Sequence, residues 1–170
     1  MWGRSGDDGV TFSSPNAIAI DSLDNVYVTE FSGDRVQKFT SDGVLLTEWG
    51  GSGTDSGQFR RPTGIAIDRL DQVYVAESGN SRVQKFNSDG EWLATFGANG
   101  RGPGEFLSAM VVIVDAQDRV YVSDWGNQRV QVFDSAGAYL DTLGFPEDSA
   151  AQELNPQGAN TGRKGEGQLF

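Results

Sequence analysis

The sequence contains no cysteine and no histidine. Without cysteine, the chain can form no disulfide, no thiolate nucleophile and no thiolate metal site. Without histidine, it lacks the commonest general base and the commonest zinc ligand. It also has no apolar run long enough to cross a bilayer, and its first residues lack the apolar stretch of a secretory signal. We therefore expect no thiol chemistry and no membrane segment in this chain, and we leave its localisation open.

Basic residues are also scarce: 13 lysines and arginines face 24 acidic residues, which gives a formal net charge of -11. A chain of this charge repels a phosphate backbone on average. Nucleic acid is therefore a disfavoured partner unless a local basic patch exists. Cations, basic proteins and neutral glycans remain compatible with this charge.

An internal repeat runs through most of the chain, with Phe12, Phe59 and Phe106 standing 47 residues apart at the start of three copies. Each copy holds four short apolar runs rich in Val, Ile, Phe and Tyr, separated by Gly, Asp, Asn and Ser. This pattern favours strands and leaves no room for a helix. Four short antiparallel strands in a repeat of this length are typical of a propeller blade. The sequence predicts an all-β partial or half propeller of three four-stranded antiparallel blades.

The two ends of the sequence also match parts of the repeat. Trp2-Gly3 matches Trp49-Gly50, and Gly167-Gln168-Leu169 matches Gly57-Gln58-Phe59. We expect either a fragment of a longer product, which we favour, or a half-propeller that associates with a copy of itself to complete the ring. The predicted organisation is the end of a preceding blade (1–11), three blades (12–58, 59–105 and 106–144), and a long loop or tail leading toward a further blade (145–170).

The second copy carries the fullest version of the motif: PTGIAID from Pro62, VYVAE from Val73, then Gly79-Asn80 and RVQKF from Arg82. This pattern resembles the NHL repeat, and the other two copies follow it with local departures. The resemblance implies a propeller that is usually six-bladed and commonly acts as a platform for partner proteins. Some related propellers are metal-dependent lyases or hydrolases, and some NHL proteins bind RNA through a basic face.

Two aspartates recur around the first turn of each copy. Carboxylates at this spacing could bind calcium, because hard cations take oxygen ligands. The spacing does not match a dedicated calcium loop, and an aspartate that accepts backbone N–H bonds in its own turn explains the same pattern. We favour the turn, predict no cofactor, and keep calcium as the weaker alternative. The residues are Asp21, Asp24, Asp68, Asp71, Asp115 and Asp118.

An acidic residue and an arginine five positions later also recur in every copy. Such pairs can meet across a hairpin or reach the adjacent blade. Because they recur, we interpret them as structural staples between blades and not as catalytic groups. The pairs are Glu30 with Arg35, Glu77 with Arg82, and Asp124 with Arg129.

Specificity is then expected where the copies differ, in loops that emerge on one face of a propeller. Exposed aromatics with arginine nearby are typical of recognition surfaces; the alternative is that they pack on a neighbouring loop. The candidate partner-binding residues are Phe31, Asp34, Arg60, Arg61, Ser78, Arg101, Trp125 and Gln128.

Three functions remain open, in this order. The first is a non-enzymatic module that binds a protein or another ligand. The second is part of a metal-dependent lyase-like or hydrolase-like enzyme whose catalytic residues lie in blades absent from this sequence. The third is an RNA-binding propeller, for which Arg60, Arg61 and Arg101 are the local argument and the net charge the opposing one.

Overall fold

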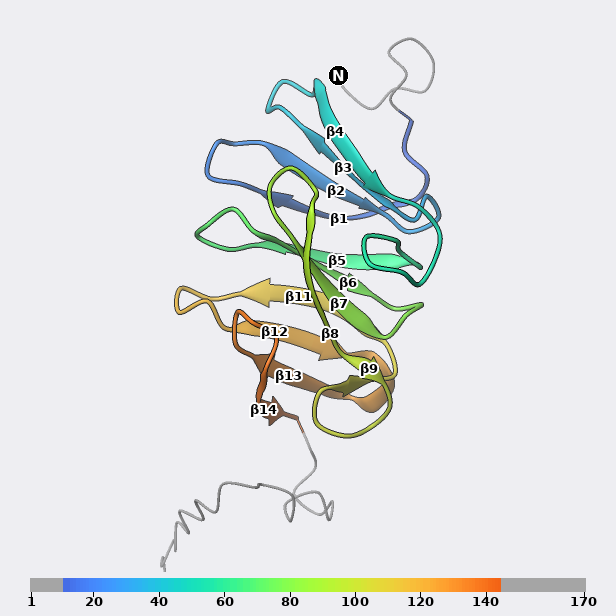
Figure 1. Cartoon of the computed structure of the whole chain (residues 1–170), viewed down its shortest axis with the longest axis vertical. Helices are drawn as coiled ribbons and strands as arrows, with labels where there is room; N and C mark the ends of the chain where they lie inside the picture. Colours follow the sequence, from blue (N-terminus) through green and yellow to red (C-terminus); the bar gives the residue numbers. More distant parts are fainter. Residues whose placement is uncertain (1–10, 145–170) are drawn as a thin grey trace, which may run out of the picture.

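The structure is a computed structural model that describes residues 11–144. These residues form three four-stranded antiparallel sheets stacked on one another, as Figure 1 shows. Strand order within each sheet follows the chain, so each sheet is a simple meander and forms one blade. The predicted fold class is confirmed. The expectations for residues 1–10 and 145–170 fall outside the described residues.

Each repeat folds into one blade with four strands. Blade 1 contains β1 (Pro15–Ile20), β2 (Val26–Glu30), β3 (Arg35–Phe39) and β4 (Leu45–Gly50). Blade 2 contains β5 (Pro62–Ile67), β6 (Val73–Glu77), β7 (Arg82–Phe86) and β8 (Trp92–Phe96). Blade 3 contains β11 (Ala109–Val114), β12 (Val120–Asp124), the 3₁₀ turn η1 (Trp125–Asn127), β13 (Arg129–Phe133) and β14 (Tyr139–Leu143). A short parallel pair, β9 (Ala98–Asn99) with β10 (Glu105–Phe106), closes the connection from blade 2 to blade 3.

The apolar core lies between the blades and not within one sheet. The phenylalanines that open the second and third repeats insert between two blades: Phe59 lies 5.5 Å from Phe86, and Phe106 lies 5.7 Å from Phe133, measured between ring centroids. All four rings are buried. Removing apolar surface from water stabilises by about 25 cal/mol per Å². Stacking of blade on blade therefore supplies most of the hydrophobic stabilisation.

The first strands of successive blades approach each other closely. A Cβ atom at Gly64 of β5 would lie 2.7 Å from the carbonyl oxygen of Met110 in β11. Blade 1 has Ala17 at the equivalent position, again a small residue facing the next blade. Small side chains at this position thus set the spacing between blades.

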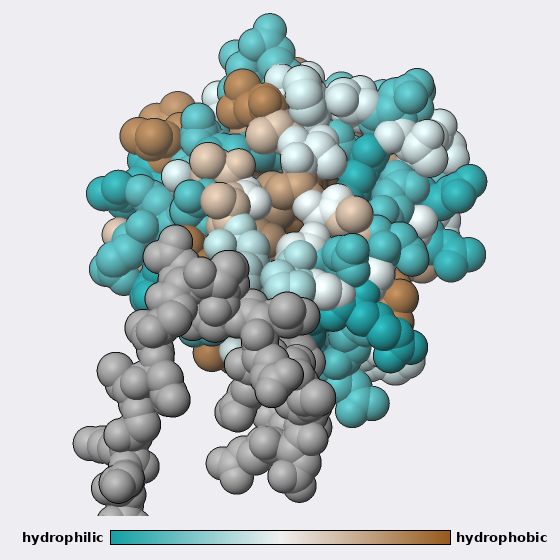
Figure 2. All heavy atoms as spheres, turned by 60° about the horizontal axis from the view of Figure 1, so that its bottom comes forward, coloured by the Kyte–Doolittle hydropathy of each residue, from teal (hydrophilic) through white to brown (hydrophobic). Residues whose placement is uncertain are grey.

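The two outer flanks of the stack carry exposed apolar residues. In β1, Ile18 is 69% exposed, whereas its counterpart Ile65 in blade 2 is 7% exposed. At the other end, Val111 and Ile113 of β11 are more than half exposed. Figure 2 turns the blade 3 end forward and shows apolar groups near its centre within a largely hydrophilic rim. The described part of the chain has no helix that could span a membrane.

Candidate functional site

The recurring acid–arginine pairs close inside each blade. Glu77 and Arg82 lie opposite each other in the β6–β7 ladder, and their side chains meet at 2.6 Å. The acid and the arginine thus meet across the hairpin, one of the two contacts that their spacing allows. The arginine then reaches the chain segment that arrives from the preceding blade, donating to the carbonyls of Thr54, Asp55 and Gln58. The pair therefore fixes the inter-blade connection to its own blade.

The same arrangement recurs in the other two blades. Arg35 contacts Glu30 at 2.6 Å, and Arg129 contacts Asp124 at 3.1 Å. The hydrogen bond from Glu30 raises the pKa of Arg35 above its ordinary value. All three acids are buried. Because the acid–arginine pair forms in every blade, we interpret these residues as structural.

The recurring aspartates at the end of each first strand organise their own turns. Asp21 accepts hydrogen bonds from the backbone N–H groups of Leu23 and Asn25, and from the hydroxyl of Tyr27. Burial opposes ionisation of Asp21, but these hydrogen bonds together with the Asn25 side chain lower its pKa. Asp68 and Asp115 make the corresponding bonds. Within residues 11–144 no three acidic side chains gather closely enough to hold one metal ion.

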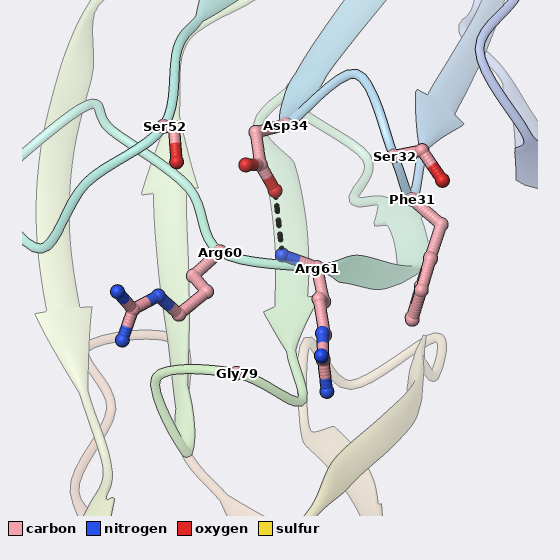
Figure 3. A pocket seen from close by; sticks show the side chains of 7 residues that line it. All are labelled: Phe31, Ser32, Asp34, Ser52, Arg60, Arg61 and Gly79. Atoms are coloured by element: carbon pink, nitrogen blue, oxygen red, sulfur yellow. Dashed lines mark hydrogen bonds between the residues drawn. The ribbon is translucent and has the colours of Figure 1, made fainter.

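A cavity of about 640 Å³ opens on the loop face at the boundary between blades 1 and 2. Its walls come from the β2–β3 loop, the connection from β4 to β5 and the β6–β7 loop. Strands alternate in direction, so these three connections emerge at the same edge of the stack, opposite the aspartate turns. Figure 3 shows the lining residues, which are Phe31, Ser32, Asp34, Ser52, Arg60, Arg61 and Gly79.

Hydrogen bonds from their backbone groups hold two consecutive arginines in place at this cavity. The Arg60 N–H donates to the buried carboxylate of Glu77 at 2.9 Å, and its carbonyl accepts from the N–H of Gly79 at 3.1 Å. The Arg61 N–H donates to the Asp34 carboxylate at 2.7 Å, and its carbonyl accepts from the N–H of Ser78 at 3.2 Å. Every backbone donor and acceptor of the pair is therefore satisfied.

Arg61 adopts an uncommon backbone conformation, with φ at 53°. A non-glycine residue in the left-handed region is worth attention, because such conformations persist only when their surroundings impose them. Ser14, at the equivalent position of blade 1, has φ 57°, so this conformation recurs at the bend of the repeat, and in blade 2 the hydrogen bond from the Arg61 N–H to Asp34 accompanies it. Gly79 packs directly against Arg60. A Cβ atom at Gly79 would lie 2.4 Å from Cγ of Arg60, so a larger residue would clash there.

The arginine side chains extend in different directions from this fixed backbone. Figure 3 shows Arg61 running alongside Phe31, while Arg60 points to the other side of the loop that carries Gly79. The guanidinium carbon of Arg61 lies 5.8 Å from the centre of the Phe31 ring, within range of a cation–π contact. Phe31 is half-buried, so it packs partly on the neighbouring blade, which was the alternative to a fully exposed recognition ring.

The predicted binding residues divide between two cavities. Phe31, Asp34, Arg60 and Arg61 line the first one, and the hydroxyl of Ser78 contacts the Arg61 carbonyl at 3.3 Å.

Trp125 and Gln128 instead line a second cavity of about 920 Å³ on the outer flank of blade 3. Blade 2 has the equivalent flank covered by Phe106 and β11 of blade 3. Arg101, in the β9–β10 loop, lines neither cavity. The loop-face prediction therefore separates into a compact set between blades 1 and 2 and an outlying set on blade 3.

Three residues of the first cavity were not predicted: Ser32, Ser52 and Gly79. Ser52 corresponds to Asn99 in the next repeat, and Ser32 corresponds to Gly79. Both serines sit at positions that vary between copies, so the criterion that selected Arg60 and Arg61 could have found them. Gly79 shares the position of Ser32 and is matched by Gly126, so only the blade 1 residue differs there.

The NHL repeat family model matches residues 59–86 and 111–133. The first range begins at the phenylalanine that opens blade 2 and ends with β7, and the second covers β11 to β13. The chain contains NHL repeats. The two NHL matches fall on blades 2 and 3, and blade 1 has the same four-stranded fold.

Solved structures with the same architecture are propellers of varied function. Virginiamycin B lyase from Staphylococcus aureus matches with a TM-score of 0.61 and 15% identity, over 88% of this chain and 45% of that chain. A chain of the nidogen/laminin complex matches with a TM-score of 0.60 and 19% identity, over 82% and 50%. U3-55K matches with a TM-score of 0.67 and 14% identity, over 87% and 43%.

At these identities the similarity establishes the fold alone. The chain spans half or less of each of these structures. No curated protein sequence matches it. Function must therefore be argued from the residues of the NHL blades themselves.

Blade 1 departs from the NHL motif at a functionally informative place. It has Gly33-Asp34 where blades 2 and 3 have Asn80-Ser81 and Asn127-Gln128. Asp34 is the residue that receives the Arg61 N–H across the blade boundary. The departure from the NHL motif thus contributes directly to the first cavity.

Proposed function

We propose that this chain is a non-enzymatic binding module that recognises a protein partner through the loops around Phe31, Asp34, Arg60 and Arg61. One observation carries the proposal: the cavity is built from positions that change between repeats. The positions equivalent to Arg60-Arg61 are Ser13-Ser14 in blade 1 and Leu107-Ser108 in blade 3. Variation at positions that the blade architecture does not dictate is what a specific recognition surface requires.

The repeated polar residues support the same proposal by contrast. Their side chains are engaged in turns and inter-blade connections, as Glu77 and Asp21 illustrate. The arginines at the cavity are exposed, and within residues 11–144 their guanidinium groups form no hydrogen bond. One of the similar folds belongs to the nidogen/laminin complex, which is an assembly of proteins.

Two alternatives rank below this one. Similarity to virginiamycin B lyase supports an enzyme only at the level of the fold. RNA binding draws on Arg60 and Arg61, but the net charge of -11 opposes an extended polyphosphate.

The size of the complete ring is part of the proposal. Three blades that span 39–50% of the similar chains correspond to rings of about six to eight blades, and we propose six. The outer flanks, which carry Ile18 and Val111, would then contact further blades, including those of a second copy.

Selection of a random twelve-residue peptide library against the folded 170-residue chain tests the proposal. We expect binders whose dissociation constant rises at least tenfold in Phe31→Ala, because truncating the ring removes one wall of the cavity. Ile18→Ala on the outer flank is the control and should change the affinity less than twofold. Binders that are insensitive to Phe31→Ala, or the absence of any binder, would overturn the proposal.

A further inference from the structure

We infer that the cavity between blades 1 and 2 binds an acidic segment of a protein partner, in which two separate carboxylates pair with Arg60 and Arg61. This inference rests on the proposed function, because it names the chemistry recognised at the same cavity. It goes beyond that function in specifying the charge, the spacing and the type of ligand.

The first argument is that both guanidinium groups remain available. Within residues 11–144, no acidic side chain forms an ion pair with Arg60 or Arg61. Arg82 shows the contrasting case, since its guanidinium group is engaged by Glu77 and by three carbonyl groups. Arginine recognises carboxylates through charge-assisted, often bidentate hydrogen bonds. Two consecutive exposed arginines without a carboxylate partner in the described part of the chain therefore favour an acidic ligand.

The second argument is that the backbone holds the pair in place before any ligand arrives. All four backbone polar groups of Arg60 and Arg61 are hydrogen-bonded, three of them to residues of the β6–β7 hairpin and one to Asp34. Arg61 is further restrained by the ring of Phe31. Binding then requires little additional ordering of the chain, and this lowers the entropic cost of association.

The third argument concerns the shape of the ligand. Figure 3 shows the two side chains pointing in different directions, with Arg60 directed away from Arg61 and Phe31, and this arrangement favours two separate anionic groups over one compact anion. Two acidic side chains spaced along a peptide can reach both. Asp34 also lines the cavity and disfavours a dense negative charge at its centre. The local balance of two positive charges and one negative charge suits separate monovalent carboxylates better than phosphate.

The fourth argument separates a peptide from RNA. The Debye length is about 8 Å at physiological salt, so a short acidic segment experiences mainly the charges at the cavity. An RNA strand would extend its phosphates over the rest of an acidic surface. The local basic charge favours a few carboxylates, whereas the charge of the whole chain opposes a polyanion.

The experiment uses peptides from the library selection described above that depend on Phe31. We expect these peptides to be enriched in two Asp or Glu residues within a few positions of each other. A synthetic peptide with both acids should bind at least tenfold more tightly than its version with Gln in place of Glu. The double variant Arg60→Gln/Arg61→Gln should raise its dissociation constant at least tenfold, and Arg60→Lys/Arg61→Lys should restore part of the loss.

Arg69→Gln is the control, because it removes one positive charge from an exposed arginine at the opposite edge of blade 2, where Arg69 pairs with Asp118 of blade 3. It should change the affinity less than twofold. Thermal melting of each variant verifies that the fold is retained. The carboxylate assignment is overturned if the Gln peptide binds equally well, or if the double arginine variant behaves like Arg69→Gln.

Two competitors test the other sources of negative charge. Inorganic phosphate at matched ionic strength, or a single-stranded RNA, should displace the peptide less effectively than unlabelled acidic peptide. Stronger displacement by either one would overturn the inference in favour of phosphate recognition. Peptides that depend on Phe31 but lack acidic residues would overturn the acidic ligand and leave the binding function intact. Peptides that do not depend on Phe31 would overturn the function itself.

Discussion

Glu77 connects the stability of blade 2 to the geometry of the binding cavity. Its carboxylate is fully buried and accepts from the side chains of Arg82 at 2.6 Å, Asn80 at 2.6 Å and Gln84 at 2.8 Å. It also accepts from the backbone N–H of Arg60 at 2.9 Å. One recurring side chain therefore holds the hairpin together and positions the arginine that differs between repeats.

Substituting Glu77→Gln should destabilise the chain strongly. The amide would place an NH₂ group among four donors and leave Arg82 without its counter-charge, although the shape is nearly unchanged. Removing one partner of a buried ion pair typically costs about 3–5 kcal/mol. Urea unfolding monitored by tryptophan fluorescence measures this loss. Glu91→Gln, at an exposed turn, should change the free energy of unfolding by about 0.5 kcal/mol or less, and a similar value for Glu77→Gln would contradict the assigned role.

The strands and their pairing could be predicted because every blade repeats the same apolar runs and turn residues. Ambiguity in one copy, such as Ala109 in place of proline, is resolved by the other two. The cavity was harder to predict from the comparison of repeats. Variation between copies identified Arg60, Arg61 and Asp34 as candidates. It could not predict that the Arg61 N–H donates to Asp34 across the blade boundary. It also grouped Trp125 with them, because position in the repeat does not distinguish a covered flank from an open one.

At the scale of strands, the spacing between blades depends on small residues in the inner strands. Gly64→Val should destabilise the chain, because its side chain would meet the backbone of Met110 and Val111 in β11. Overpacking of this kind typically costs about 1–3 kcal/mol. The matched control is Val111→Ala at the equivalent position of blade 3, where valine is 55% exposed. It should change the free energy of unfolding by about 0.5 kcal/mol. Chemical denaturation compares the two, and equal effects would show that the β5–β11 contact does not limit the spacing.

At the scale of the molecule, the stack formed by residues 11–144 has one blade covered on both faces and two blades covered on one face. Every residue of β6 is buried, whereas β1 is exposed at alternate positions and at its first two residues. In repeat proteins the stability of each unit depends on the interfaces with its neighbours. Blade 2 has two such interfaces, and blades 1 and 3 have one each among the described residues.

Hydrogen exchange should reveal this gradient as slowest exchange in β6 and β7 and faster exchange in β1 and β14. Local opening of an outer blade breaks one interface, whereas opening of blade 2 breaks both and approaches global unfolding. Mass spectrometry of peptic fragments from a dilute sample measures the order. Equal protection of β1 and β5 would contradict a half-covered flank at Ile18 and would indicate that another surface covers it. Sedimentation at the same concentration then identifies the cover: a dimer would show that a second copy of the chain supplies the missing interface, and a monomer would place it within the chain itself.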